Sequence, residues 1–174
     1  MNGITIRFAG VQDAALIADM SRQTFYDTFA SVNTIDDMEK FMGEQFTHEM
    51  LAKEVEEANG IFLLAYDGEL PVGYARMREG EKRIEFDGNS SIEIARIYAT
   101  KTVIGKGVGK LLMEKCIDTA EEQNRSIIWL GVWEKNTRAI AFYQKWGFEK
   151  FAEHDFVLGT DVQTDWLMMK NLVE

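Results

Sequence analysis

The sequence predicts a mixed α/β (α+β) fold in which one sheet is covered by helices. Strand-like segments recur along the chain, segments of helical periodicity separate them, and two further strand-like segments close it. The 174 residues, 46% of them hydrophobic, suit a packed core of ordinary size. One proline, no internal repeat and no flexible linker leave no domain boundary, so we expect one domain over 1–174.

The first half of the chain carries two strand-like regions separated by helical patterns. ITIRFAG alternates apolar and polar residues, and the next segment has apolar residues near helical spacing, with Asp13 placed to cap it. IFLLAYDGELPVGYARMRE holds two strand-like runs around an Asp-Gly turn, which predicts a hairpin. The expected elements are a strand at 4–9, a helix over Leu16, Ile17, Met20 and Phe25, a helical stretch at 34–59, and strands at 61–66 and 71–79.

The second half alternates in the same way. SIEIARIYAT reads as a strand, and a glycine-rich segment then leads into an apolar helix. SIIWLGVW is typical of a buried strand, and NTRAIAFYQKW is an amphipathic helix that Gly147 ends. FEKFAEH and TDWLMMK supply the last two strands. The remaining expected elements are a strand at 91–99, a helix to about 123, a strand at 126–133 and a helix at 136–146.

The formal net charge of −10 bears on the choice of partner. Nucleic acid is bound by basic patches, so we expect no nucleic-acid partner. A negative field attracts cations, which fits a cationic ligand, although such a charge also serves solubility alone. The charge is concentrated in 34–59, where eight acidic residues against two lysines give a net charge of −6.

Other compartment and cofactor signals are weak. The N-terminus lacks a signal-peptide pattern, and no apolar run approaches the roughly 20 residues that span a bilayer, so we expect a cytoplasmic protein without a membrane partner. Cys116 lies in the apolar pattern of a helix and is expected to be a buried thiol. His48 and His154 lie far apart, and no metal-ligand spacing occurs, so we expect no metal.

The segment VIGKGVGKLLMEKC, residues 103–116, places glycines at every second position directly before a helix. It is not a Walker A loop, because Gly109-Lys110 is followed by Leu111 and no hydroxyl is available for magnesium. It is not the dinucleotide fingerprint either, because Lys110 stands where the last glycine is needed. Nucleotide hydrolysis and hydride transfer therefore lose support.

The same segment is suited to binding an anion. Free N–H groups and the dipole at a helix N-terminus favour phosphate oxygens, and glycines let the backbone approach them closely. Lys106 and Lys110 add positive charge around the three glycines. A plain strand-to-helix turn with its lysines in solvent is the alternative.

A second motif lies in WLGVWEKNTRAIAFYQKWGFEKF. Asn136 occupies an N-cap position, and Ala139, Phe142, Tyr143 and Trp146 then share one helical face. A face of this kind usually packs into the core. Tyr143 differs from its neighbours because a buried hydroxyl needs a polar partner.

Together, IARIYATKTVIGKGVGKLLM and the N-x-x-A-x-x-F-Y-x-x-x-G-F pattern from Asn136 to Phe148 resemble the GCN5-related N-acetyltransferases (GNAT). More narrowly, TFYDTF, IWLGVWEKN, AIAFYQKWGF and QTD are similar to the bacterial PaiA-type polyamine N-acetyltransferases. The resemblance implies one central, mostly antiparallel sheet of about seven strands flanked by helices. It also implies that the strands at 91–99 and 126–133 splay apart to admit acetyl-CoA.

The resemblance further implies how acetyl-CoA is held. The backbone at 97–99 would pair with the pantetheine arm, amides of 105–110 would hold the pyrophosphate, and Asn136 would contact the arm. Tyr98 and Phe142 have packing as the alternative. Ile104 departs from the family's usual Gln or Arg, which removes a polar contribution to cofactor affinity. The cofactor-binding candidates are Ile97, Tyr98, Ala99, Gly105, Lys106, Gly107, Val108, Gly109, Lys110, Asn136, Phe142 and Lys145.

Acetyl transfer requires the amine to lose a proton and the departing thiolate to gain one. Tyr143 is the candidate proton donor, from its place in the motif, with a packed core tyrosine as the alternative. Glu93 is the candidate base, because several family members place a glutamate at this point of the strand. A solvent-facing residue or a contact to a cationic acceptor are the alternatives for Glu93. No Ser-His-Asp or Cys-His signal indicates an acyl-enzyme.

The acceptor implied by the PaiA-like segments is spermidine or spermine, and the acidic stretch 34–59 is consistent with a cation. Asp27 and Glu44 are the candidate substrate contacts, with a solvated helix face as the alternative. Phe25, Tyr26 and Phe29 could line the cleft or fill the core. Acetylation of another amine (a protein N-terminus, a lysine or an antibiotic) and an acyl-CoA-binding regulatory module with little turnover are the other functions. A monomer and a homodimer both fit the sequence.

Overall fold

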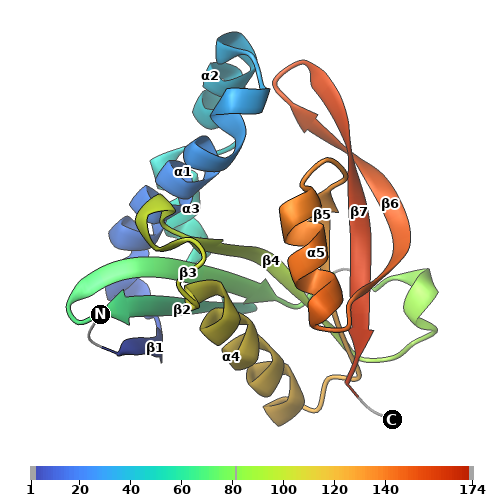
Figure 1. The fold of residues 1–174 in the computed structure, drawn as a ribbon. Helices are drawn as coiled ribbons and strands as arrows, with labels where there is room; N and C mark the ends of the chain where they lie inside the picture. Colours follow the sequence, from blue (N-terminus) through green and yellow to red (C-terminus); the bar gives the residue numbers. More distant parts are fainter. Residues whose placement is uncertain (1–2, 81, 173–174) are drawn as a thin grey trace.

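The computed structural model describes residues 3–80 and 82–172, and within them the chain forms a seven-stranded sheet (Figure 1). The strands are β1 (Ile4–Phe8), β2 (Gly60–Asp67), β3 (Leu70–Arg78), β4 (Ser91–Ala99), β5 (Ile127–Trp133), β6 (Glu149–Leu158) and β7 (Asp161–Asn171). Their order is β1-β2-β3-β4-β5-β7-β6, and neighbours are antiparallel except β4 and β5, which are parallel. The predicted mixed α/β fold with a mostly antiparallel sheet is confirmed.

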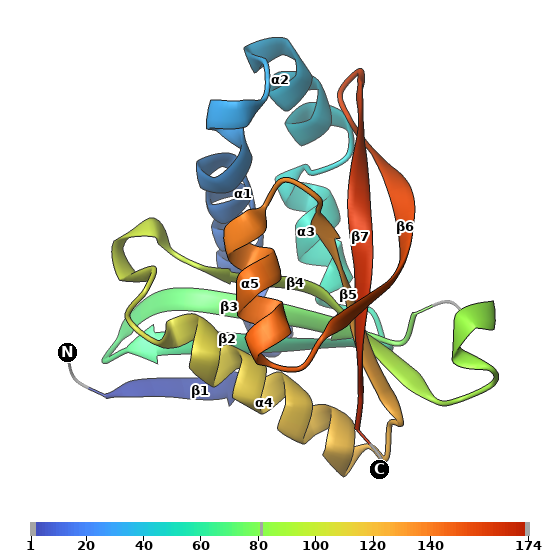
Figure 2. The same cartoon turned by 45° about the vertical axis from the view of Figure 1, so that its right-hand side comes forward.

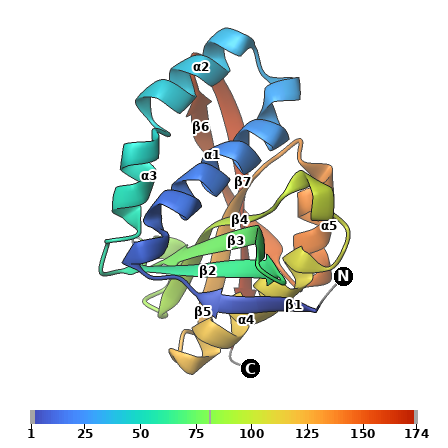
Figure 3. The ribbon, with the colours of Figure 1, turned by 90° about the vertical axis from the view of Figure 1, so that its left-hand side faces the viewer.

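Helices cover both faces of the sheet (Figures 2 and 3). The helices are α1 (Ala14–Phe29), α2 (Ile35–Glu44), α3 (His48–Glu54), α4 (Val108–Glu122) and α5 (Thr137–Lys145), with short 3₁₀ turns at Val11–Asp13, Ala30–Val32, Ile84–Phe86 and Lys101–Val103. Helices α4 and α5 pack on one face with Leu63 and Ala65 of β2, whereas α1 packs on the other with Phe62 and Leu64. Strand β2 is apolar on both sides because both of its faces are buried.

Two local expectations need correction. The stretch 34–59 is not one helix, because Thr47 starts a second one by accepting a hydrogen bond from the Met50 N–H at 3.2 Å. Asp13 stands at the N-cap of α1 but makes no capping bond with its side chain. Its carboxylate instead accepts two hydrogen bonds from Arg7, at 2.7 and 2.8 Å, and this lowers its pKa.

Strands β4 and β5 separate part-way along their length. They are paired from Ser91 with Ile127 up to Ile94 with Leu130, and not beyond. The β3–β4 register shifts at the same level, so that Ala95 has no partner on β3, and β4 then stays paired with β3 alone. Figure 2 shows the β1–β4 half and the β5–β7–β6 half running in clearly different directions.

The turn between β6 and β7 rests on the start of α2. Gly159 in this turn has φ +66°, and a Cβ there would lie 2.5 Å from the Asp37 Cα. The Asp37 carboxylate accepts hydrogen bonds from the Thr160 N–H at 2.6 Å and the Thr160 hydroxyl at 2.8 Å. This contact joins the second half of the sheet to the N-terminal helices. Among the residues that the structure describes, no helix has the length and apolar character needed to cross a bilayer.

Candidate functional site

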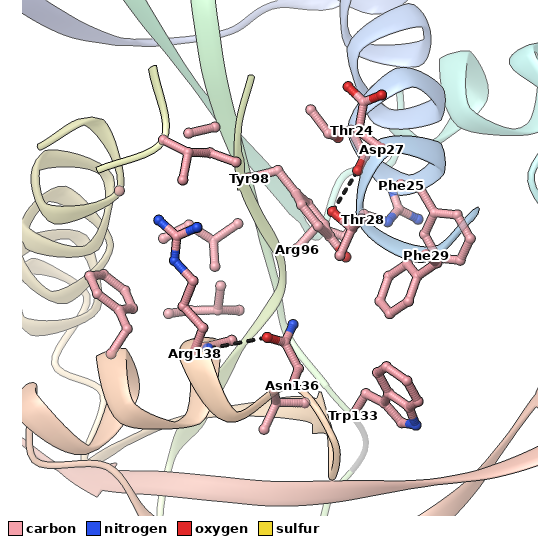
Figure 4. Close-up of a pocket in the computed structure, with 18 of the residues that line it drawn as sticks. Thr24, Phe25, Asp27, Thr28, Phe29, Arg96, Tyr98, Trp133, Asn136 and Arg138 are labelled. Atoms are coloured by element: carbon pink, nitrogen blue, oxygen red, sulfur yellow. Dashed lines mark hydrogen bonds between the residues drawn. The ribbon is translucent and has the colours of Figure 1, made fainter. Parts of the chain in front are cut away.

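A cavity of about 810 Å³ lies where β4 and β5 diverge (Figure 4). Its floor is the second half of β4, from Ile94 to Ala99, and Gly131 to Trp133 of β5 form the opposite edge. The start of α4 and the helix α5 close one end, whereas α1, α2 and the β6–β7 hairpin close the other. The two predicted motifs and the N-terminal helices therefore meet at one place.

The glycine segment forms one wall of this cavity. Gly105 and Gly107 have φ values of +83° and +90°, which favour glycine, and Gly107 is the N-cap of α4. A Cβ built at either glycine would meet no heavy atom within 4 Å, so the loop backbone is open on this side. The first N–H groups of α4 are thereby left free to bind an anion.

Positive charge gathers beside that wall. Lys101, Lys110 and Arg138 line the cavity, and Figure 4 shows Arg138 pointing into it from α5. Lys101 and Arg138 are absent from the sequence-based set of candidates, although the NTRAIAFY motif contains Arg138. The two other predicted lysines, Lys106 and Lys145, do not line the cavity.

Helix α5 supplies Asn136 and Tyr143. The Asn136 Oδ1 accepts a hydrogen bond from the Ala139 N–H at 3.2 Å and so caps the helix at the cavity edge (Figure 4). Tyr143 lines the cavity while its ring packs on Phe142 and Phe148. Burial raises the pKa of the Tyr143 hydroxyl, which therefore stays protonated near neutral pH.

Glu93 lies apart from this group. It is buried in the paired part of β4, opposite Arg78 and Trp129, and does not line the cavity. The Arg78 Nε donates to its carboxylate at 2.5 Å. The structure therefore does not bring Glu93 together with Tyr143, and the role of Glu93 as base stays a prediction without geometric support.

The other end of the cavity is walled by aromatic rings. Figure 4 shows Phe25 and Phe29 of α1 on the side that faces Trp133, and the Phe29 and Trp133 ring centroids are 6.1 Å apart. Asp27 lines this end and is exposed, whereas Glu44 is exposed at the end of α2 and does not line the cavity. The aromatic lining residues are Phe25, Phe29, Phe41, Phe46, Trp133 and Phe156, with Tyr98 and Tyr143 nearer the centre.

Two carboxylates of the acidic stretch 34–59, those of Glu54 and Glu57, have partners in the protein rather than in the cavity. Glu54 accepts two hydrogen bonds from Arg96, at 2.7 and 2.8 Å, and also pairs with Arg76 at 3.0 Å. Glu57 pairs with the same Arg76 at 2.7 Å. These ion pairs fasten α3 to β3 and β4, so the negative charge here has a structural use.

Two polar cavity residues have no predicted role. Gln163 and Asp165 come from β7, and Asp165 is the register partner of both Trp133 and His154. Burial raises the pKa of the Asp165 carboxyl, although the nearby His154 acts in the opposite direction. The QTD segment contains both residues but gives no sign of what they do.

The predicted set is thus divided by the structure. Of the cofactor candidates, Lys106, Val108 and Lys145 do not line the cavity, and Val108 is buried in the core. Within 3–80 and 82–172, no group of three or more His, Cys, Asp or Glu side chains has an arrangement suited to a metal ion. The candidates that line the cavity are Ile97, Tyr98, Ala99, Gly105, Gly107, Gly109, Lys110, Asn136, Phe142, Tyr143 and Asp27.

Comparison with known proteins identifies the family. The model of the acetyltransferase (GNAT) family matches residues 22–148. An N-acetyltransferase of Lactobacillus delbrueckii subsp. lactis, encoded in the pepI 3′ region, is 37% identical over 99% of this chain and 100% of its own length. The chain belongs to the GNAT family. Its predicted membership is therefore confirmed.

Two further matches are more limited. The spermine/spermidine N(1)-acetyltransferase of Bacillus subtilis (strain 168) is 33% identical over 53% of this chain and 61% of its own length. The crystal structure of a PaiA N-acetyltransferase from Thermoplasma acidophilum in complex with coenzyme A superposes with a TM-score of 0.75. That match covers 97% of this chain and 99% of the other, at 20% identity, and it supports the GNAT fold.

Proposed function

We propose that this GNAT chain is an N-acetyltransferase that moves the acetyl group of acetyl-CoA directly to a primary amine. The observation that carries the proposal is the continuity of one cavity, which joins the glycine wall, the Tyr143 hydroxyl and two carboxylates, Asp27 and Asp165. An anion site, a proton donor and negative charge for a cation therefore share one space.

The residues present fit acetyl-CoA. The second half of β4 has no strand partner on its β5 side, so its backbone groups are free to bind the pantetheine arm. The open backbone at Gly105 and Gly107 suits the pyrophosphate, and Lys101, Lys110 and Arg138 supply the opposite charge. The complex of coenzyme A with the structurally similar PaiA N-acetyltransferase supports the same cofactor.

Bound acetyl-CoA supplies an acetyl thioester, whose C–S bond breaks as the acceptor nitrogen forms a C–N bond with the acetyl carbon. In our proposal Tyr143 donates the proton that the leaving sulfur takes up. The Tyr143 hydroxyl is protonated near neutral pH, as a donor has to be before the reaction. The acceptor nitrogen loses its second proton once the C–N bond has formed, and that proton returns to Tyr143 through water.

We infer that the acceptor is a small cationic amine, with spermidine and spermine as first candidates. The Bacillus subtilis relative supports this choice, and so do the carboxylates of Asp27 and Asp165. The aromatic walls favour a second candidate, a monoamine on an aromatic skeleton, because aromatic faces attract both apolar groups and cations.

Release of free thiol from acetyl-CoA tests the proposal. Purified protein is mixed with acetyl-CoA and spermidine, spermine or phenethylamine, and a reaction without amine is the control. Saturable release with any of the three amines supports the enzyme, and the rates rank the acceptors. A rise in melting temperature with acetyl-CoA, without release for any amine, would contradict the proposal and favour an acyl-CoA-binding regulatory module.

A further inference from the structure

Asp165 has a setting that differs from every other carboxylate near the cavity. Its side chain is 17% exposed, and the basic group beside it is the His154 imidazole, whose Nε2 lies 3.7 Å from the Asp165 Oδ2. Glu93 and Glu54, by contrast, are each held by arginine at hydrogen-bond distance. Asp27 is exposed to solvent. Asp165 is therefore a partly buried carboxylate whose charge is compensated weakly within the described residues.

Three strands place this carboxylate in a defined row. Trp133 of β5 lies opposite Asp165 of β7, and Asp165 lies opposite His154 of β6. Gly131 stands just past the last β4–β5 pair, and a Cβ there would be 3.8 Å from the Asp165 Oδ2. The missing side chain at Gly131 leaves this oxygen open to the cavity at the point where the strands diverge.

We propose that Asp165 binds the ammonium group of the acceptor and takes its proton, with His154 passing that proton to solvent. The inference rests on the proposed acetyltransferase function and names the group that prepares the acceptor. A partly buried anion beside aromatic rings attracts a primary ammonium, because water screens its charge less than at the surface. Trp133 and Phe29 supply such rings at this end of the cavity.

The proton balance is simple. One N–H bond of the ammonium breaks, an O–H bond forms on the Asp165 carboxylate, and the electron pair stays on nitrogen as the lone pair that attacks. The proton then passes to the His154 imidazole, whose Nε2 lies 3.7 Å from the Asp165 Oδ2 and reaches hydrogen-bond distance with a small side-chain movement. His154 is half exposed, so the imidazolium loses this proton to bulk water.

Other charges around the cavity leave this role to Asp165. Arg96 on the β4 floor is occupied by Glu54, and so it does not neutralise Asp165. Burial raises the pKa of Tyr98, and the negative charge of Asp165 adds to that shift, as do Tyr74 and Tyr143. Asp165 thus lies within electrostatic range of Tyr98, which in turn lies within range of the proposed donor Tyr143. His154 lies next to Asp165, and the other titratable or charged residues that line the same cavity are Arg96, Tyr98, Tyr143, Arg138, Lys101, Lys110 and Asp27.

A purely structural ion pair between β6 and β7 is the alternative for Asp165 and His154. It explains the position less well, because a pair with a half-exposed imidazole at 3.7 Å contributes little stability. A weakly paired, partly buried carboxylate in a cavity is more typical of a functional group.

Steady-state kinetics of Asp165→Asn, with the amine that the wild type acetylates best, tests the proposal. Asp155→Asn is the matched control, because Asp155 is an exposed carboxylate next to His154 that does not line the cavity. We expect kcat to fall about 10²-fold in Asp165→Asn, as for loss of a general base, and to change less than about twofold in the control. We also expect the fall of wild-type kcat toward low pH to be absent from Asp165→Asn, and His154→Gln to lose less kcat than Asp165→Asn.

Unchanged kcat and an unchanged pH profile in Asp165→Asn would overturn the inference and leave the acetyltransferase function standing. If the wild type acetylates none of the amines, the proposed function itself fails. Binding of the amine can then be measured separately, from the carboxyl carbon-13 resonance of Asp165. Coenzyme A-loaded protein is titrated with spermidine and with phenethylamine. A saturable shift with either amine supports ammonium binding at Asp165, and no shift with both overturns it.

Discussion

Ile94 of β4 and Leu130 of β5 are the last residues that the two parallel strands pair, and both are buried in the main hydrophobic core. Beyond them, the edge of β4 is unpaired over 95–99 on its β5 side. The proposed cofactor site depends on this free edge, because backbone groups left without a strand partner are available to a ligand.

Hydrogen exchange tests that dependence. We expect acetyl-CoA to slow amide exchange in 95–99 and in the first turn of α4, because the ligand would cover these N–H groups. Residues 91–94 are an internal control, since they are already paired with β5. Exchange measured by mass spectrometry with and without acetyl-CoA gives the answer. Protection confined to 91–94, or absent from 95–99, would contradict this placement.

Gly73 sets the closeness of α4 to β3. A Cβ at Gly73 would lie 2.8 Å from the Tyr98 carbonyl oxygen and 3.0 Å from the Val108 Cγ1. We expect Gly73→Ala to lower the free energy of unfolding by about 1–3 kcal/mol, as overpacking does. Gly43→Ala is the matched control, because nothing lies within 4 Å of a Cβ there and alanine favours the helix by up to about 1 kcal/mol. Urea unfolding of both variants checks this, and equal stabilities would be inconsistent with the tight contact.

Arg138 and Lys145 distinguish the cofactor site that the cavity suggests from the one that the family resemblance implies. Both are exposed cations of α5, but Arg138 lines the cavity and Lys145 does not. We expect Arg138→Ala to raise the KM for acetyl-CoA several-fold, and more at low salt, because it removes charge beside the phosphates. Lys145→Ala should leave the KM within about twofold, on the same electrostatic reasoning. A larger effect at Lys145 would restore the role that the resemblance implies for it.

The pH dependence of stability reports on Asp165. Burial raises the pKa of its carboxyl, so the folded chain keeps this proton to higher pH than the unfolded chain. Stability from this group is therefore present at low pH and is lost as pH rises through the raised pKa. We expect Asp165→Asn to melt at a higher temperature than the wild type at pH 7, with the gain vanishing near pH 4, close to the unfolded carboxyl pKa of about 3.9. A lower melting temperature at pH 7 would instead indicate a stabilising Asp165–His154 pair.

The parts of the site that lie in contiguous segments of the chain could be predicted from the sequence. The glycines, Asn136 and Tyr143 lie in contiguous motifs whose spacing reflects helix geometry, and the structure places them around one cavity. The sheet could also be predicted, because alternation and apolar runs mark each strand. The ends of the last two strands could not be predicted. In the structure the β6–β7 hairpin extends to Leu158 and Asp161 through contact with α2.

Non-local features escaped prediction. Asp165 enters the cavity because β7 pairs with β5, a neighbour more than thirty residues earlier in the chain. The alternation of β4 correctly predicts that Glu93 faces opposite to Ile92 and Ile94. It does not predict the level at which β5 separates from β4. Glu93 lies one residue before that level, where Arg78 from β3 binds it. The ion pairs of Glu54 escaped prediction in the same way, because the arginines that form them come from distant strands.

The turnover of Tyr143→Phe with acetyl-CoA and the best amine tests whether Tyr143 donates the proton to the leaving sulfur. Phenylalanine keeps the ring packing on Phe142 and Phe148 and removes the hydroxyl alone. We expect kcat to fall about 10²- to 10⁴-fold, the range for a lost general acid, with little change in the KM for acetyl-CoA. A kcat equal to that of the wild type at saturating substrates would contradict it, because the cavity would then transfer acetyl groups without the proposed donor.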